Sequence, residues 1–158
     1  MTDDDTNRLT RRSLLGIFAA TAIFAAPTGG NAFGILRGAG DIRRIRMYSG
    51  RTGESIDMLY WIDGQYIPEA LRAINHFMRD FRNSKVARID TRTLDIMAAS
   101  HRLLDAGEPY TLLSGYRSPE TNAALRRQSR GVARDSLHMR GQAADLRLRS
   151  RSVSQMAQ

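Results

Sequence analysis

The stretch that decides the fold reads SLHMRGQAADLRL, residues 136–148. It places the imidazole of His138 seven residues before the carboxylate of Asp145, with Gly141 between them. The run from Ala143 to Leu148 predicts a strand, so a His entering the turn and an Asp leaving it can converge on one cation. Imidazole nitrogen and carboxylate oxygen together suit zinc, and a glycine allows positive φ or a close backbone approach. Taken alone, the pair also fits a surface His beside a solvated Asp, so a second motif has to decide.

That second motif is SGYRSP, residues 114–119, which follows the apolar run Tyr110–Leu113. The run predicts a strand, and Ser118-Pro119 predicts a turn into a helix over residues 120–127. Arg117 would then be held at the carboxyl end of the strand. An arginine fixed there can hydrogen-bond a developing oxyanion or a substrate carboxylate.

The two motifs together resemble the zinc D-alanyl-D-alanine peptidase superfamily, and within it murein endopeptidase K and its relatives. The resemblance rests on SGYRSP followed by Ser-x-His-x-x-Gly-x-Ala-x-Asp, and it extends upstream through shorter matches in the same order. It covers roughly Arg43 to Leu148. The upstream matches are YSGRTGE at 48–54, YW at 60–61, DGQY at 63–66, ID at 89–90 and LD at 94–95.

The resemblance implies an α+β fold in which a small antiparallel sheet is flanked by helices. It also implies zinc-dependent hydrolysis of peptide cross-links in peptidoglycan, during cell wall remodelling outside the cytoplasmic membrane. By this resemblance His138 and Asp145 hold Zn2+, and Arg117 is the catalytic residue that stabilises the oxyanion or positions the peptide carboxylate. The general base stays unassigned.

The donor set departs from the family pattern after Asp145. A catalytic zinc usually takes three protein ligands, and the family supplies the third from a later His-x-Asp element. Residues 146–158 contain neither His nor acid. We therefore expect either a C-terminally incomplete peptidase or a shortened relative that binds wall peptides without cutting them; a stand-in ligand from His76 or His101 would need a rearranged fold.

The amino-acid composition limits which other classes of function are possible. The 158 residues suit one domain, and 42% hydrophobic residues can form a core. No cysteine is present, which excludes disulfides and thiolate metal sites. The net charge of +8 is spread without an aromatic-interleaved cluster, so no nucleic-acid partner is predicted. A basic binder of polyanions remains an alternative, because a positive field attracts any anionic polymer.

The first 41 residues predict an exported protein. Arg11 and Arg12 precede a short apolar run, Leu14–Ala26, which is typical of a twin-arginine signal peptide and short for a bilayer span. We assign residues 1–32 to the signal, with cleavage after Ala26 or Ala32, 33–41 to a linker and 42–158 to the peptidase-like domain. The expected partners are the twin-arginine machinery and peptidoglycan peptides, in the periplasm or cell wall, without a stable membrane span; an uncleaved signal anchor is the alternative.

Between the linker and the motifs, the pattern predicts a hairpin and two helices. Residues 42–48 and 55–61 alternate like strands, and Asp63-Gly64 forms a further turn. One helix begins at Pro68 and carries Leu71, Ile74, Met78 and Phe81 on one face before the break at 83–85. A second begins with Asp90 or Thr91 as its N-cap and ends near Gly107. His76 and His101 are interpreted as structural residues of these helices, and Asp135 as a loop residue.

Overall fold

The computed structural model describes residues 41–151, all of which belong to the second of two units, Asn31–Gln158. The predicted signal peptide and residues 33–40 of the linker lie outside the described residues. The elements follow in the order β1 (Ile42–Ser49), β2 (Ser55–Ile62), β3 (Gln65–Tyr66), α3 (Pro68–Phe77), α4 (Thr91–Leu103), β4 (Tyr110–Ser114), α5 (Pro119–Gln128), the 3-10 helix η3 (Leu137–Arg140) and β5 (Asp145–Arg147).

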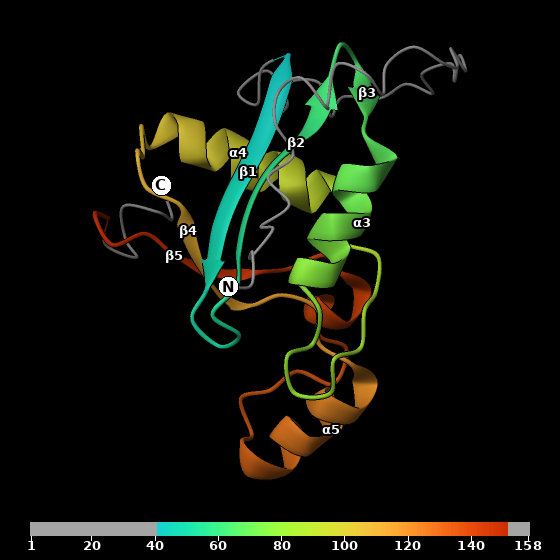
Figure 1. Ribbon diagram of the computed structural model, residues 1–158. Helices are drawn as coiled ribbons and strands as arrows, with labels where there is room; N and C mark the ends of the chain where they lie inside the picture. The colour runs from blue at the N-terminus through green and yellow to red at the C-terminus, as the bar shows by residue number, and fades with distance from the viewer. Residues whose placement is uncertain (1–40, 152–158) are drawn as a thin grey trace, which may run out of the picture. The chain divides into compact units, whose positions relative to one another are not determined.

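The five strands form one sheet in the order β3-β2-β1-β4-β5 (Figure 1). β1 and β2 pair antiparallel, as do β2 and β3 and also β4 and β5. Only β1 and β4 are parallel, because α3 and α4 return the chain to the starting end of the sheet before β4 begins. The predicted α+β class is confirmed; the sheet was expected to be antiparallel, and it is mostly so, with β1 and β4 as the parallel pair.

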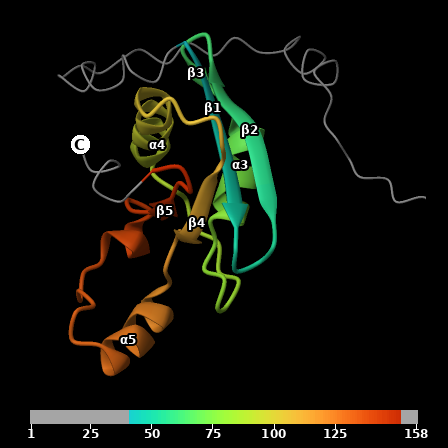
Figure 2. The ribbon, with the colours of Figure 1, turned by 90° about the vertical axis from the view of Figure 1, so that its left-hand side faces the viewer.

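Strand β1 shows why the sheet packs on one face. Its buried side chains alternate from Arg43 through Ile45 and Met47 to Ser49, as the two-residue period of a half-buried strand requires. The same apolar cluster includes Ile74 of α3 and Leu94 of α4. Both helices therefore contribute to a single core, and Figure 2 shows α4 running along one side of the sheet.

Helix α3 ends earlier than its apolar spacing predicts. The pattern runs to Phe81, but the helix stops at Phe77, with Met78 as its C-cap. The Met78 carbonyl accepts a hydrogen bond from the Tyr116 backbone N–H at 2.7 Å instead of from a following turn of helix. The chain then turns through Ser84, whose φ is 59°. A contact with a segment far along the chain thus overrides the local period.

Helix α4 begins as the sequence predicts. Asp90 is the N-cap, and its carboxylate accepts the backbone N–H of Arg92 at 3.0 Å. An aspartate at this position satisfies a helix N–H that would otherwise lack a partner. The Arg92 side chain also donates to this carboxylate at 2.8 Å. This hydrogen bond is the main cause that lowers the pKa of Asp90 to about 2.

A buried ionic cluster ties α4 to the sheet. Asp95 is fully buried and pairs with Arg43 of β1 at 2.7 Å. Its oxygens also accept the hydroxyls of Tyr60 at 3.1 Å and Tyr66 at 2.5 Å. Burial, and secondly the charge of Asp95, raise the pKa of Tyr60, so its hydroxyl stays protonated. The cluster joins β1, β2, β3 and α4 through one carboxylate.

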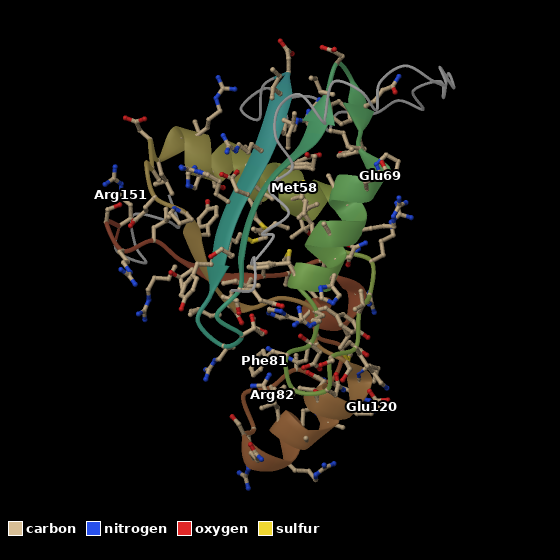
Figure 3. All side chains as sticks on the ribbon, in the orientation of Figure 1. Met58, Glu69, Phe81, Arg82, Glu120 and Arg151 are labelled. Carbon is tan, nitrogen blue, oxygen red and sulfur yellow. The ribbon has the colours of Figure 1, made fainter. Side chains whose placement is uncertain are left out.

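The last described residues return to the end of α4. The Ser150 backbone N–H donates to the Glu108 carboxylate at 2.7 Å, and the Arg151 guanidinium donates to the Leu104 carbonyl at 2.9 Å. Figure 3 labels Arg151 on this side, and labels Glu120 on α5, which stands away from the sheet at its other end. Within residues 41–151 no helix is long and apolar enough to cross a membrane.

Candidate metal centre

The site begins where β4 ends and the chain meets the end of α3. Gly115 lies directly against Met78: a Cβ on Gly115 would sit 3.0 Å from the Met78 Cβ and closer still to the Met78 carbonyl oxygen. The next residue, Tyr116, donates its backbone N–H to that same carbonyl. A glycine is therefore required for the backbone to approach this closely.

Asp80 holds the beginning of α5 in place. It is 1% exposed, and its carboxylate accepts the backbone N–H of Ser118 at 2.9 Å. Burial raises the pKa of Asp80, but hydrogen bonds from the Thr121 side chain and from backbone amides outweigh it and hold this pKa below its usual value. The Ser118 hydroxyl accepts from Asn83 at 2.8 Å and from the Thr121 backbone N–H at 3.2 Å, which makes it the N-cap of α5. The SGYRSP turn is thus fixed at Tyr116 by the Met78 carbonyl and at Ser118 by the Asp80 carboxylate.

The turn that carries His138 is fixed by Gly141. This residue has a φ of 66°, in the left-handed region, and it ends η3. A Cβ here would lie 2.9 Å from the Ile89 Cα and closer still to the Arg88 carbonyl oxygen. The Gly141 carbonyl accepts the Asp90 backbone N–H at 3.0 Å. Both reasons for a glycine that the sequence raised, positive φ and close approach, are confirmed.

His138 and Asp145 face each other across this turn. The Nδ1 of His138 lies 2.8 Å from the Gly115 carbonyl oxygen, which can only accept, so Nδ1 carries the proton. In the neutral ring Nε2 then holds the free lone pair, and it lies 3.5 Å from Oδ1 of Asp145. The His138 side chain is 13% exposed and that of Asp145 is 54% exposed. His138 is thus held by the backbone of Gly115, whereas Asp145 is open to solvent.

Arg117 is joined to the same turn through its backbone. Its N–H donates to the His138 carbonyl at 3.2 Å, and its side-chain Nη1 donates to Asn122 of α5 at 3.4 Å. The Nε atom is buried and has no hydrogen-bond partner among the described residues. Asn122 also donates to the carbonyls of Ala133 at 3.1 Å and Arg134 at 3.2 Å. One buried amide therefore connects Arg117, α5 and the loop that leads to His138.

The structure brings His138 and Asp145 together, and Arg117 joins them by its backbone. His76 belongs to the last turn of α3, whereas the His101 ring lies 2.7 Å from the Glu108 carbonyl and packs edge-on against Tyr110. Among residues 41–151 no group of three His, Cys, Asp or Glu side chains is arranged to hold a metal. The contacts of His101 agree with its interpretation as a structural residue, and the same interpretation of His76 stays a prediction.

Sequence reasoning missed the supports of the site. Asp80 and Asn122 fall in segments that the sequence predicts as helices, Asn83 falls in the predicted break at 83–85, and the pattern gives none of them a role in the site. The available signal was weak: Asn122 follows the Ser-Pro start of α5 at a position that turns out to be 2% exposed. A buried amide is predictable only when the neighbouring carbonyls are known.

Comparison with known proteins gives the family. A family model described as peptidoglycan L,D-endopeptidase MepK matches residues 37–158. The chain belongs to the MepK family. The peptidoglycan L,D-endopeptidase MepK of Escherichia coli K12 is 37% identical over 150 residues, which cover 95% of this chain and 80% of that protein. The Shigella flexneri protein of the same name matches to the same extent.

A more distant MepK relative, from Haemophilus influenzae, carries the name probable peptidoglycan L,D-endopeptidase and is 34% identical over 98 residues. These cover 61% of this chain and 53% of that protein. No solved structure gives a significant match. The resemblance found in the motifs is therefore confirmed at the level of the MepK family, which is a peptidase family as the sequence predicted.

Proposed function

We propose that this protein is a zinc-dependent peptidoglycan endopeptidase whose metal is held by His138 and Asp145. Support comes first from the relatives, which are named as peptidoglycan L,D-endopeptidases. The substrate would then be the peptide cross-links of the wall polymer. The net charge of +8 favours encounter with a polymer that carries carboxylates.

The observation that carries the proposal is the distance between the two donor atoms. Zinc binds imidazole nitrogen and carboxylate oxygen at about 2.0–2.2 Å, so two such ligands at a tetrahedral angle lie about 3.4 Å apart. His138 Nε2 and Asp145 Oδ1 are 3.5 Å apart. The hydrogen bond from Nδ1 to the Gly115 carbonyl is the outer contact that metal-binding histidines usually make. The residues present therefore fit zinc.

When bound, zinc polarises a carbonyl and lowers the pKa of a coordinated water toward ~7. The protein groups have separate tasks. His138, with its proton fixed on Nδ1, offers the lone pair of Nε2 as a neutral metal ligand. Asp145 supplies negative charge from an exposed position, and Arg117 supplies positive charge for a peptide oxygen. The buried Nε of Arg117, which has no hydrogen-bond partner within residues 41–151, is the kind of unsatisfied donor that functional sites retain.

The two-residue donor set supports a second candidate, a relative that binds wall peptides without cutting them. Two ligands hold zinc more weakly than three, and a catalytic site usually has three. Zinc affinity and cleavage must therefore be measured separately. The full chain would be titrated with zinc against a chromophoric chelator and, in parallel, incubated with purified sacculi to detect released peptides.

Variants assign the roles. His138→Ala should abolish zinc binding, and Asp145→Asn should weaken it, while His76→Ala on α3 serves as the matched histidine control. Arg117→Gln should keep zinc and reduce peptide release by about 10²–10³-fold, the cost of losing one oxyanion donor. Undiminished zinc retention in His138→Ala would refute the site. Tight zinc without any peptide release from the unsubstituted chain would favour the binding candidate.

Export by the twin-arginine route to the periplasm is part of the same proposal. It is supported by Arg11-Arg12 ahead of the short apolar run and by a wall substrate outside the cytoplasmic membrane. Replacing both arginines by lysine should retain the protein in the cytoplasm, as measured by fractionation. Normal export of this double variant would point to another route.

A further inference from the structure

A pocket distinct from the metal pair opens beside the first half of β1. The ladder between β1 and β4 runs only from Met47 and Tyr110 to Ser49 and Leu112. In the part of the chain that the structure describes, no strand pairs with residues 42–46 on this side. A cavity of about 190 Å³ lies here between β1 and α4. None of its lining residues comes from segments 114–118 or 136–145.

The floor of this pocket is apolar. It is formed by Ile45 of β1, Met97 and Ala98 of α4, and Tyr110 of β4, all of which belong to the core. An engineered apolar cavity of about 150 Å³ accommodates a benzene ring, so this one has room for a small side chain and the atoms attached to it. Open strand edges also present backbone N–H and C=O groups that an extended peptide can pair with.

The rim of the pocket is cationic. It carries Arg44, Arg46 and Arg102 together with His101, and no acidic residue lines the cavity. Arg44 is neutralised by Asp57, whose two carboxylate oxygens accept its guanidinium N–H groups.

The other two arginines keep donors for a ligand. Arg46 uses one Nη atom to bind the Gly107 carbonyl at 2.8 Å. A guanidinium has five N–H donors, so most of those on Arg46 remain. Arg102 is exposed, and no carboxylate of residues 41–151 pairs with it. Two guanidinium groups that pair with no carboxylate of the described residues therefore border an apolar floor.

We propose that this pocket binds the free carboxylate end of a short peptide. The carboxylate would pair with Arg46 and Arg102, the last side chain would rest on the apolar floor, and the peptide backbone would run along the open edge of β1. Arginine matches the two oxygens of a carboxylate in a bidentate arrangement, which a neutral ligand end cannot use. This inference does not depend on zinc or on cleavage.

The test uses the metal-free full chain and the probe acetyl-alanyl-alanine, with its C-terminal amide as the matched neutral ligand. Binding is followed by amide chemical shifts in ¹⁵N-labelled protein. The acid should shift Ala98, Arg102 and Tyr110 and should bind at least about tenfold more tightly than the amide. Shifts confined to residues 114–118 and 136–145, or equal binding of acid and amide, would overturn the proposal.

Variants test whether binding of the carboxylate requires Arg46 and Arg102. Arg46→Gln with Arg102→Gln should weaken binding of the acid at least about tenfold, whereas Arg72→Gln with Arg127→Gln makes the same change in net charge outside the pocket and should leave binding intact. Arg102→Gln alone removes an exposed guanidinium that pairs with no carboxylate of residues 41–151, so it keeps the test valid if the double variant fails to fold. Unchanged affinity in Arg102→Gln and in the folded double variant would refute the assignment.

A second arm identifies the source of the peptide. Purified sacculi carry peptide carboxylates on the polymer, so their co-sedimentation with the metal-free protein should fall in the double variant and be reversed by the acid probe. Retained co-sedimentation, together with binding of the probe, would assign the pocket to free peptides. Failure of zinc binding or cleavage would leave all these measurements unaffected, so the two proposals can fail independently.

Discussion

Replacing Gly141 by alanine tests the packing of the metal turn most directly. The substitution imposes two costs. A non-glycine residue at a φ of 66° costs about 1–2 kcal/mol. The new Cβ would also lie 2.9 Å from the Ile89 Cα, and closer to the Arg88 carbonyl oxygen, both of which are backbone atoms. Overpacking of this kind typically costs about 1–3 kcal/mol, so the expected loss is roughly 2–5 kcal/mol.

Two other glycines separate these costs. Gly64 has a φ of 81°, and a Cβ at this position would meet no heavy atom of residues 41–151 within 4 Å beyond its chain neighbours, so Gly64→Ala should show the backbone cost alone. Gly115 has no positive φ but lies against Met78, so Gly115→Ala should show the packing cost alone. Urea unfolding of the three variants, with zinc titration of each folded protein, gives the comparison. A loss for Gly141→Ala no larger than that for Gly64→Ala would refute the close approach of residues 88–89 to the turn.

Three carboxylates give further predictions, each measured by chemical unfolding. Asp95→Asn should destabilise the fold by about 3–5 kcal/mol, because it removes the buried negative charge that pairs with Arg43 at 2.7 Å; a loss under about 1 kcal/mol would contradict the buried ion pair. Asp80→Asn should cost about 1–3 kcal/mol through its bond to the Ser118 N–H, and an unchanged midpoint would count against it. Asp90→Ala should cost about 1 kcal/mol at neutral pH. Because the pKa of Asp90 is depressed to about 2, its contribution is present above the unfolded pKa of about 3.9 and disappears as the pH falls toward 2; a difference from the unsubstituted chain that persists at pH 2 would be the contrary result.

The sequence predicts those elements whose formation depends on residues near one another in the chain. The alternation of β1 and β2, the Asp63-Gly64 turn with both residues at positive φ, and the Asp90 cap of α4 all follow from neighbouring residues. The glycine at position 141 was also predictable as a turn residue, although the contacts of the turn with residues 88–90 were not. The seven-residue spacing of His138 and Asp145 allows the two donor atoms to approach each other, and the structure places them 3.5 Å apart.

Features that depend on distant partners could not be predicted. The parallel pairing of β1 with β4 joins Met47 to Tyr110, and no local pattern encodes it. The early end of α3 depends on Tyr116 in the same way. Arg43 of β1 is buried against Asp95 of α4, and no residue near Arg43 in the sequence indicates that partner. In each case a partner far along the chain decides the outcome.

The two bonds between the SGYRSP turn and the metal turn have a consequence for how the chain can be divided. Gly115 and Arg117 contact His138 directly, so residues 118–137 form a loop that is closed at its base. Ser129, Arg130 and Gly131 near its far end are exposed, and Figures 1 and 2 show α5 standing away from the sheet. Exposed loop tips tolerate cutting and circular permutation. A chain split at Arg130 should therefore reassemble from two fragments, one of which brings His138 and Asp145 to a scaffold formed by the other.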